Sequence, residues 1–192
     1  EQGRPARILE LSDEEKEIIK DSFLLTMKPI LYVTNVSENE ISEDNEYVKC
    51  VKEYATKEKA PVVVLCAKVE EELSELSDSD KEELLSALGI GISGLDKLIK
   101  ATYDLLGLAT YFTVGKDEVR AWTFKKGMNA KKCAGIIHTD FEKGFIRAEI
   151  VPYDVLLECG NFNNAKEKGK VRSEGKDYVV KDGDVVLFRF NV

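Results

Sequence analysis

Apolar positions in the first part of the chain switch between helical spacing and short, nearly continuous runs. The capping box Ser12-Asp13-Glu14-Glu15 predicts a helix over 13–26. Its apolar spacing predicts a buried stripe formed by Ile18, Ile19, Phe23 and Leu24. The runs at 29–35 and 61–66 are almost wholly apolar, as in strands that are covered on both faces.

A helical pattern separates these two runs. Over 43–57 the apolar side chains recur at helical spacing, through Val48, Val51 and either Tyr54 or Ala55. A strand, a helix and a strand in this order predict a parallel βαβ unit.

The remainder of this region is also expected to be helical in part. Ser79-Asp80-Lys81-Glu82 resembles a second capping box, which predicts a short helix through Leu88. A further helix is expected to bury one face, formed by Leu95, Leu98, Ile99, Thr102, Leu105 and Leu106. The acidic run at 70–75 reads as a solvated loop or the start of a helix.

From Gly107 the pattern changes to short strands and turns. Runs at 110–114 and 119–124 flank Gly115-Lys116-Asp117-Glu118 and predict a hairpin. The following elements are expected to be a helix from Asn129 to about 138, a strand over 145–150, a helix over 153–158 and a strand over 185–190. The last strand is apolar on both faces apart from Arg189, which predicts a central position. This pattern suggests a β-grasp module.

Composition and charge support two parts of one globular protein. The 192 residues are 43% hydrophobic and 33% charged, and no apolar run approaches the roughly 20 residues of a membrane helix. Residues 1–106 hold 13 Lys+Arg against 24 Asp+Glu, a net charge of −11, whereas residues 107–192 hold 15 against 12, a net charge of +3. The first part should therefore repel polyanions. The cysteine spacing fits neither zinc sites nor a secreted disulfide framework, which favours reduced thiols and a cytoplasmic protein.

The ends of the two predicted strands carry the side chains best suited to hold a ligand, because ligands in open α/β sheets bind there. Asn35-Val36-Ser37-Glu38 follows the first strand. An Asn side chain presents a carbonyl and an amide together, and these match the N6 and N7 edge of adenine. Cys66-Ala67-Lys68 follows the second strand as a small-residue loop whose backbone can approach the same base.

These motifs resemble a known family. Asn35-x-x-Glu38 after PILYV, with PVVVLCAK at 61–68, looks like the base-recognition motifs of P-loop GTPase-type domains in the Obg-like ATPase, or YchF, branch. Residues 107–192 resemble the C-terminal TGS domain of that family through GLATYFTVGKDEVRAWTFKKG, AGIIHTDFEKGFIRAEIVPYD and GKDYVVKDGDVVLFRFNV. The resemblance implies a partial P-loop NTPase parallel sheet with helices, followed by an α+β β-grasp domain. The implied ranges are 1–27 for the end of a helical insertion, 28–106 for the C-terminal half of the nucleotide domain and 107–192 for TGS.

The chain departs from the superfamily pattern in two ways. Ordinary members of the superfamily carry the motif NKxD, whose Asp binds guanine. Here Val36 replaces the Lys and Glu38 replaces the Asp, and the resemblance implies a preference for ATP over GTP. No GxxxxGK[ST] occurs, so the chain lacks the phosphate cradle and the hydroxyl that binds Mg²⁺. We therefore expect no catalytic or metal-binding residue, no retained cofactor and no hydrolysis by this chain. Because it begins with Glu1 and opens inside a helical pattern, we interpret it as a fragment or a processed product.

Plainer interpretations of the candidate residues stay open. Asn35 and Glu38 also suit a turn, and Lys68 also suits the surface, whereas Cys66 fits a small buried residue better than a reactive thiol. His138, the single histidine, fits a helix end bonded to backbone. A basic surface for RNA or another partner is suggested by Lys125, Lys126, Lys131, Lys132 and Arg147. Strand alternation favours a core position for Trp122 and Phe124.

The leading hypothesis is the C-terminal portion of a ribosome-associated, ATP-binding and ATP-hydrolysing protein that uses Mg²⁺ when intact. By resemblance, the TGS module contacts the ribosome, rRNA or tRNA, and no membrane partner is expected. The alternative is a stand-alone β-grasp module that binds RNA or protein without nucleotide. A truncated nucleotide domain should also expose a sheet edge, which a second copy of the chain would cover by self-association.

Overall fold

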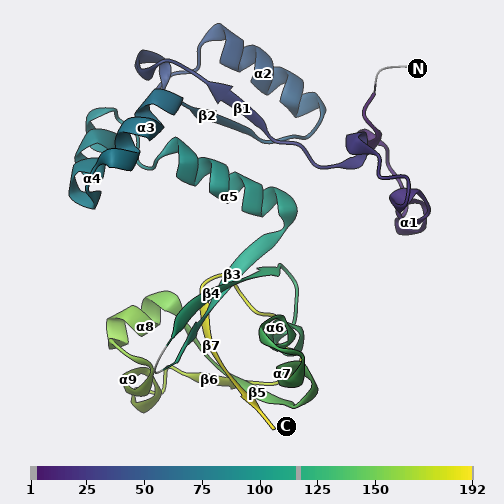
Figure 1. Ribbon diagram of the computed structural model, residues 1–192, viewed down its shortest axis with the longest axis vertical. Coiled ribbons are helices and arrows are strands. Elements are labelled where there is room, and N and C mark those ends of the chain that lie inside the picture. Colours follow the sequence, from purple (N-terminus) through teal and green to yellow (C-terminus); the bar gives the residue numbers. More distant parts are fainter. Residues whose placement is uncertain (1–3, 116–117, 192) are drawn as a thin grey trace. The chain divides into compact units, whose positions relative to one another are not determined.

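The protein divides into two compact units, residues 1–106 and residues 107–192, each with its own sheet (Figure 1). The computed structural model describes residues 4–115 and 118–191. The division falls where the net charge of the sequence changes from negative to positive. Together the units have a mixed α/β fold, as the sequence predicts. None of the helices among the described residues is long and apolar enough to span a membrane.

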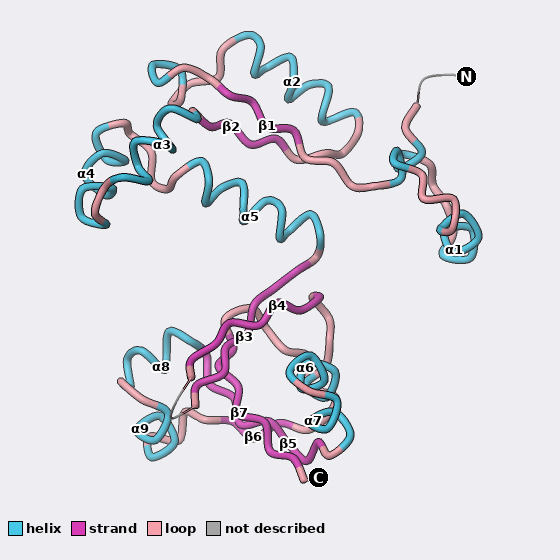
Figure 2. Tube along the Cα trace, in the orientation of Figure 1, coloured by secondary structure: helices cyan, strands magenta, loops and turns pink. Residues whose placement is uncertain are grey.

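The first unit is built around a two-stranded parallel sheet, β1 (Tyr32–Asn35) and β2 (Val62–Leu65), in which Tyr32 pairs with Val62 and Asn35 with Leu65. Helix α2 (Glu46–Lys57) connects the strands, so the predicted βαβ unit is confirmed. On α2 the buried positions are Val48 and Ala55, whereas Tyr54 is 53% exposed. Figure 2 shows α2 on one side of the strands and α5 on the other.

Three expectations for this region are wrong. Helix α1 (Asp13–Lys20) has the predicted Ser12 capping box but ends early, because Phe23 adopts a φ of 47° that a helix does not allow. Its expected buried stripe is exposed, with Ile18 at 78% and Phe23 at 85%. Strand β1 is not covered on both faces: helix α5 packs against β2, and Val33 on β1 keeps 46% of its surface.

Three helices complete the first unit: α3 (Ala67–Glu75), α4 (Asp78–Ala87) and α5 (Gly94–Leu106). The capping residue of α4 is Ser77, which accepts a hydrogen bond from the Asp80 amide; Ser79, the predicted cap, lies inside the helix. The apolar face of α5 is only partly buried, since Leu95 and Ile99 remain about half exposed. Short 3₁₀ turns lie at η1 (Ala6–Ile8), η2 (Leu25–Met27) and η3 (Glu38–Glu40).

The second unit has a five-stranded mixed sheet in the order β4-β3-β7-β5-β6. The strands are β3 (Leu108–Val114), β4 (Val119–Lys125), β5 (Phe145–Pro152), β6 (Arg172–Glu174) and β7 (Asp184–Phe190). The predicted hairpin of β3 and β4 and the central position of β7 are both confirmed. In the hairpin turn, Lys116 and Asp117 lie outside the described residues.

Helices cover both faces of this sheet. On one face, α6 (Ala130–Ile137) and α7 (Thr139–Lys143) pack over a core that includes Tyr111, Phe124, Ile150 and Phe188. On the other, α8 (Tyr153–Cys159) and α9 (Phe162–Glu167) pack over Val151 and Val185. The order of the strands and the position of α6 correspond to the β-grasp arrangement expected from the sequence. Asn129 caps α6, as predicted, by accepting a hydrogen bond from the Lys132 amide.

Candidate functional site

The two strand exits meet at one edge of the first unit. Oδ1 of Asn35, the last residue of β1, accepts a hydrogen bond of 2.9 Å from the amide of Ala67 beyond β2. The next amide, that of Val36, donates to the Leu65 carbonyl at 2.9 Å and extends the ladder by one residue. The side-chain oxygen Oδ1 of Asn35 thus already accepts a hydrogen bond within the protein, and the side-chain nitrogen Nδ2 is the donor that Asn35 offers to a ligand.

The residues after β2 form the start of a helix and not the predicted loop. Cys66, 3% exposed, is the N-cap residue of α3, and Ala67 and Lys68 occupy its first turn. The helix forms because Val69 and Leu73, four residues apart, bury one face against Leu84 and Leu85 of α4 and against Leu88, the residue that follows α4. Asn35 therefore satisfies one of the amides that a helix start leaves without an intrahelical partner.

Three charged side chains lie at the same edge. Nζ of Lys68 lies 3.5 Å from the Glu38 carboxylate and 3.6 Å from that of Glu72. The carboxylates of Glu72 and Glu38, in that order, raise the pKa of Lys68. Glu38 is thereby directed toward the start of α3. Of the six predicted base-site residues, Asn35, Glu38, Ala67 and Lys68 come together at the surface, while Cys66 is buried below them.

A cavity of about 440 Å³ adjoins Asn35 and Val36 on the side of α2. Its lining contains three residues that the sequence interpretation missed, Glu40, Asn45 and Tyr47. Glu40 accepts hydrogen bonds from the Ser37 hydroxyl at 2.6 Å and from Asn45 Nδ2 at 3.0 Å. These bonds, Ser37 first, lower the pKa of Glu40, which keeps it ionised beside the cavity. The signal in the sequence was the Ser37-x-x-Glu40 capping box, which lies directly after the strand.

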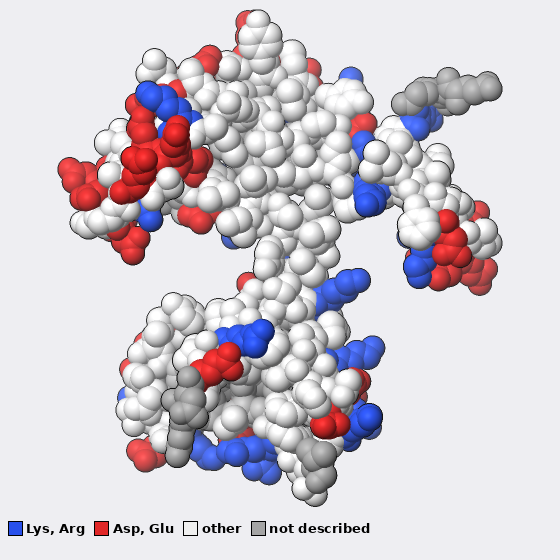
Figure 3. Space-filling view, in the orientation of Figure 1, with Lys and Arg blue, Asp and Glu red and all other residues white. Residues whose placement is uncertain are grey.

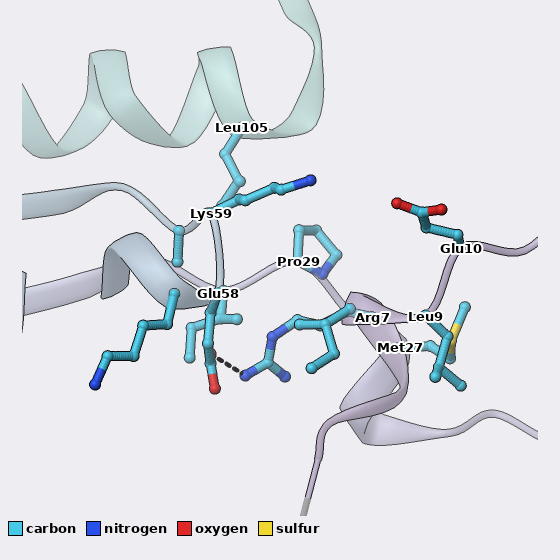
Figure 4. Close-up of a pocket in the computed structure, with 12 residues that line it drawn as sticks. Arg7, Leu9, Glu10, Met27, Pro29, Glu58, Lys59 and Leu105 are labelled. Carbon is cyan, nitrogen blue, oxygen red and sulfur yellow. Dashed lines mark hydrogen bonds and ion pairs between the residues drawn. The ribbon is translucent and has the colours of Figure 1, made fainter. Parts of the chain in front are cut away.

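A larger cavity of about 550 Å³ lies at the opposite, amino-terminal ends of β1 and β2 (Figure 4). Arg7 projects toward Glu58 there, with Nη2 2.7 Å from the carboxylate. The hydroxyls of Tyr32 and Tyr54 also donate to Glu58, at 2.9 and 3.1 Å. The hydrogen bond from Arg7, and after it those from Tyr32 and Tyr54, lower the pKa of Glu58. Burial raises this pKa, but by less, so the pKa of Glu58 stays below its usual value. Because ligands bind beyond the carboxyl ends of strands, this cavity is a weaker candidate for a base site.

The predicted basic surface of the second unit is split between two faces of the sheet. Lys131 and Lys132 lie on α6. Lys125 and Lys126 follow the end of β4. Arg147 belongs instead to the face of β5 that carries Glu149 and α9, because alternate residues of a strand point to opposite faces. Phe124 is buried at 3%, whereas Trp122 is half-buried with its indole N–H bonded to Thr113 Oγ1 at 2.9 Å.

His138 ends α6 and caps α7, with Nδ1 accepting from the Asp140 amide at 3.2 Å, as its position in the sequence predicts. Across residues 4–115 and 118–191, no three or more His, Cys, Asp or Glu side chains are grouped to hold a metal ion. The strand exits thus present an amide donor, a backbone edge and an ion pair. Such groups can form hydrogen bonds and close contacts with a planar ligand.

Comparison with known proteins places these features in a family context. The family model YchF-GTPase_C, described as "Protein of unknown function (DUF933)", matches residues 108–191. The chain is 60% identical, over its whole length, to the ribosome-binding ATPase YchF of Bacillus subtilis, of which it covers 53%. It is 42% identical to the Obg-like ATPase 1 of Rattus norvegicus and covers 49% of that protein.

A solved structure agrees with these sequence relatives. The structure of the Schizosaccharomyces pombe YchF GTPase superposes with a TM-score of 0.82 at 35% identity, covering 97% of this chain and 50% of that one. The chain therefore spans about half the length of the curated relatives that it matches.

Proposed function

Because the chain belongs to the YchF family of Obg-like ATPases, we propose that it supplies base recognition and a TGS interaction module to a ribosome-associated ATPase. In this proposal residues 28–106 are the C-terminal half of the nucleotide-binding domain and residues 107–192 are the TGS module. Residues 1–27 are the end of a helical insertion. The whole protein is proposed to act in the cytoplasm on ATP with Mg²⁺, and the phosphates and metal are held by residues outside this chain.

The observation that carries the proposal is the hydrogen bond between Asn35 Oδ1 and the Ala67 amide. It fixes the Asn35 side chain at the carboxyl end of the sheet and leaves Nδ2 to donate to a base nitrogen such as N7. Val36 adds apolar contact at the rim of the adjoining cavity. The residues fit a purine edge, and they hold it in place without taking part in bond breaking.

The pairing of Glu38 supports ATP as the ligand. A carboxylate that binds guanine must accept hydrogen bonds from its N1 and N2, whereas adenine presents no such pair of donors. Glu38 is engaged by Lys68 at 3.5 Å, which competes with that role. We therefore expect tighter binding of ATP than of GTP.

The test is equilibrium binding of fluorescent ATP and GTP to the longest gene product that contains these residues. Tighter GTP binding would contradict the role given to Glu38. The codons upstream of Glu1 provide a second check: a GxxxxGK[ST] loop supports the ATPase, and a genuine start codon beside Glu1 contradicts it.

Ribosome association is proposed from the relatives that carry it in their names, the ribosome-binding ATPases of Bacillus subtilis and Haemophilus influenzae. The expected result is that the 192-residue chain pellets with ribosomes at low salt. Absence of the chain from the ribosome pellet would count against this part of the proposal.

A stand-alone binding module is the second candidate. The observation in its favour is that the second unit buries two clusters of its own, over both faces of its sheet. A gene product that pellets with ribosomes and yet binds neither ATP nor GTP would favour this candidate over the first.

A further inference from the structure

The face of the second unit opposite α6 holds a group of cations built around one buried carboxylate. Glu149, 5% exposed, lies on β5 and accepts from Arg189 of β7 through Nε at 3.3 Å and Nη2 at 3.1 Å. Arg147 bonds the same carboxylate at 3.1 Å, and Lys166 of α9 lies 3.6 Å away. Side chains from two strands and a helix thus converge on one point.

A shallow cavity of about 220 Å³ opens between these side chains, and Arg147, Glu149, Lys166, Val171, Arg172 and Ser173 line it. Arg172 pairs with Ile150 of β5, so its side chain lies on the opposite face of the sheet, where the Tyr178 hydroxyl accepts from its Nη2 at 3.1 Å. It borders the cavity without adding its charge to the group around Glu149. The cavity is smaller than those that enclose a drug-sized molecule or a nucleoside. It is large enough for a single tetrahedral anion.

The charge count at this cavity is unequal. Arg147, Lys166 and Arg189 carry three positive charges around the single carboxylate of Glu149. Hydrogen bonds from Arg189 and Arg147, with Lys166 adding charge, hold the pKa of Glu149 below its usual value despite burial, so this carboxylate is ionised at neutral pH. A surplus of about two positive charges is left at the cavity.

The cationic groups remain accessible while they are held in place. The side chains of Arg147, Lys166 and Arg189 keep 46–58% of their surface. Figure 3 shows blue side chains gathered beside β6 on this unit. A buried carboxylate that restrains two arginines lowers the entropy lost when their remaining N–H groups bind an anion.

We propose that this cluster, which we call the Glu149 cluster, is a binding site for phosphate groups of an RNA backbone. The planar forks of Arg147 and Arg189 match phosphate oxygens, and the unit that carries them has a net charge of +3. An RNA partner fits better than an acidic peptide, because the cavity has a single apolar side chain, Val171, in its lining. This inference deepens the proposed ribosome association and rests on it, and it selects the sheet face opposite Lys131 and Lys132.

The test measures binding of the 192-residue chain to protein-free ribosomal RNA and to whole ribosomes. The variant Arg147→Gln/Lys166→Gln removes two exposed cations that each touch Glu149 once. We expect its RNA affinity at about 50 mM salt to fall roughly tenfold, and the slope of log K against log salt to decrease by about 1 to 1.5. The matched control Lys143→Gln/Lys181→Gln removes the same charge from exposed positions outside the cavity, and it should lose much less.

The outcomes separate this site from the broader proposal. If the unmodified chain binds ribosomes and RNA, and the double variant binds RNA as well as the control does, the Glu149 cluster is not the site. If the chain pellets with ribosomes but has no affinity for protein-free RNA, the partner is a protein and the RNA proposal is overturned. If the chain does not pellet with ribosomes at all, the proposed ribosome association itself fails. Circular dichroism of each variant excludes loss of folding as the cause.

Discussion

At the scale of single residues, Asn35 has two roles: its Oδ1 accepts a hydrogen bond from the Ala67 amide, and its Nδ2 is the proposed donor to the base. The substitution Asn35→Asp separates these two roles. In Asn35→Asp an oxygen still accepts from the Ala67 amide beside a helix start, where a negative charge is favourable. The Nδ2 donor is lost. We expect thermal stability close to that of the unmodified chain, and ATP affinity of the longer gene product reduced about tenfold.

The comparison variant is Asn35→Ala, which removes both functions. It should lower stability by about 1 kcal/mol as well, because the Ala67 amide loses its acceptor. Equal ATP binding by Asn35→Asp and the unmodified protein would assign Asn35 to structure alone.

Glu58 makes the first unit sensitive to acid. Its carboxylate accepts from Arg7, Tyr32 and Tyr54, and the bond from Arg7 is the main cause of its lowered pKa. A carboxyl whose pKa is lower in the folded protein stabilises the fold above its unfolded pKa, and that contribution is lost as the pH falls through the folded value. We expect residues 4–27 to become sensitive to protease as the pH falls below about 4.5.

The variant Glu58→Gln provides the control for this prediction. It should show the same protease sensitivity already at pH 7, with little further change on acidification. Limited proteolysis followed by mass spectrometry measures both. A Glu58→Gln chain as resistant as the unmodified one would show that the contacts of Glu58 do not hold this segment.

At the scale of elements, the start of α4 tests local capping. Ser77, and not Ser79, accepts from the Asp80 amide. We therefore expect Ser77→Ala to lower the stability of the first unit by about 1 kcal/mol, and Ser79→Ala to change it by less than about 0.5 kcal/mol. Urea unfolding followed by circular dichroism measures both variants, and the reverse order of effects would contradict the assignment of the cap.

The elements that the sequence predicted well are those whose signals are local. The Ser12 and Asn129 caps, the βαβ order and the central β7 follow from short patterns that burial then satisfies. The buried stripe of 13–26 failed because amphipathic spacing identifies an apolar face without supplying a partner for it, and Ile18 stays exposed. Ser77 and Ser79 are two positions apart and each has an acidic residue three positions later, so the sequence alone does not tell which of them is the cap.

The candidate site shows the same distinction. The strand exits could be located from the apolar runs, and their meeting follows from the parallel pairing. The bond from Ala67 to Asn35 spans 32 positions in the sequence, and no local pattern encodes it. Glu149 was missed for a related reason: its partners come from β5, α9 and β7, and only the folded sheet brings them together.

At the scale of the whole molecule, the two units differ in how much apolar surface they bury. Both larger core clusters belong to residues 107–192, and the described cluster of residues 1–106 is built on Cys66, Val69 and Leu73. The first unit also leaves large apolar side chains exposed, among them Phe23 and Tyr47. Because burial of apolar surface is the main stabilising contribution, the first unit should be the less stable of the two.

We therefore expect calorimetry of the 192-residue chain to resolve two transitions, with residues 1–106 unfolding at the lower temperature. Val69→Ala and Val186→Ala remove the same two carbons from fully buried positions in α3 and β7. Each should cost about 2 kcal/mol and lower one transition by about 8–16 °C while leaving the other in place. Hydrogen exchange assigns the transitions to their units. A single transition that both variants shift equally would mean that the two cores unfold as one, and the lower stability of the first unit would then be undefined.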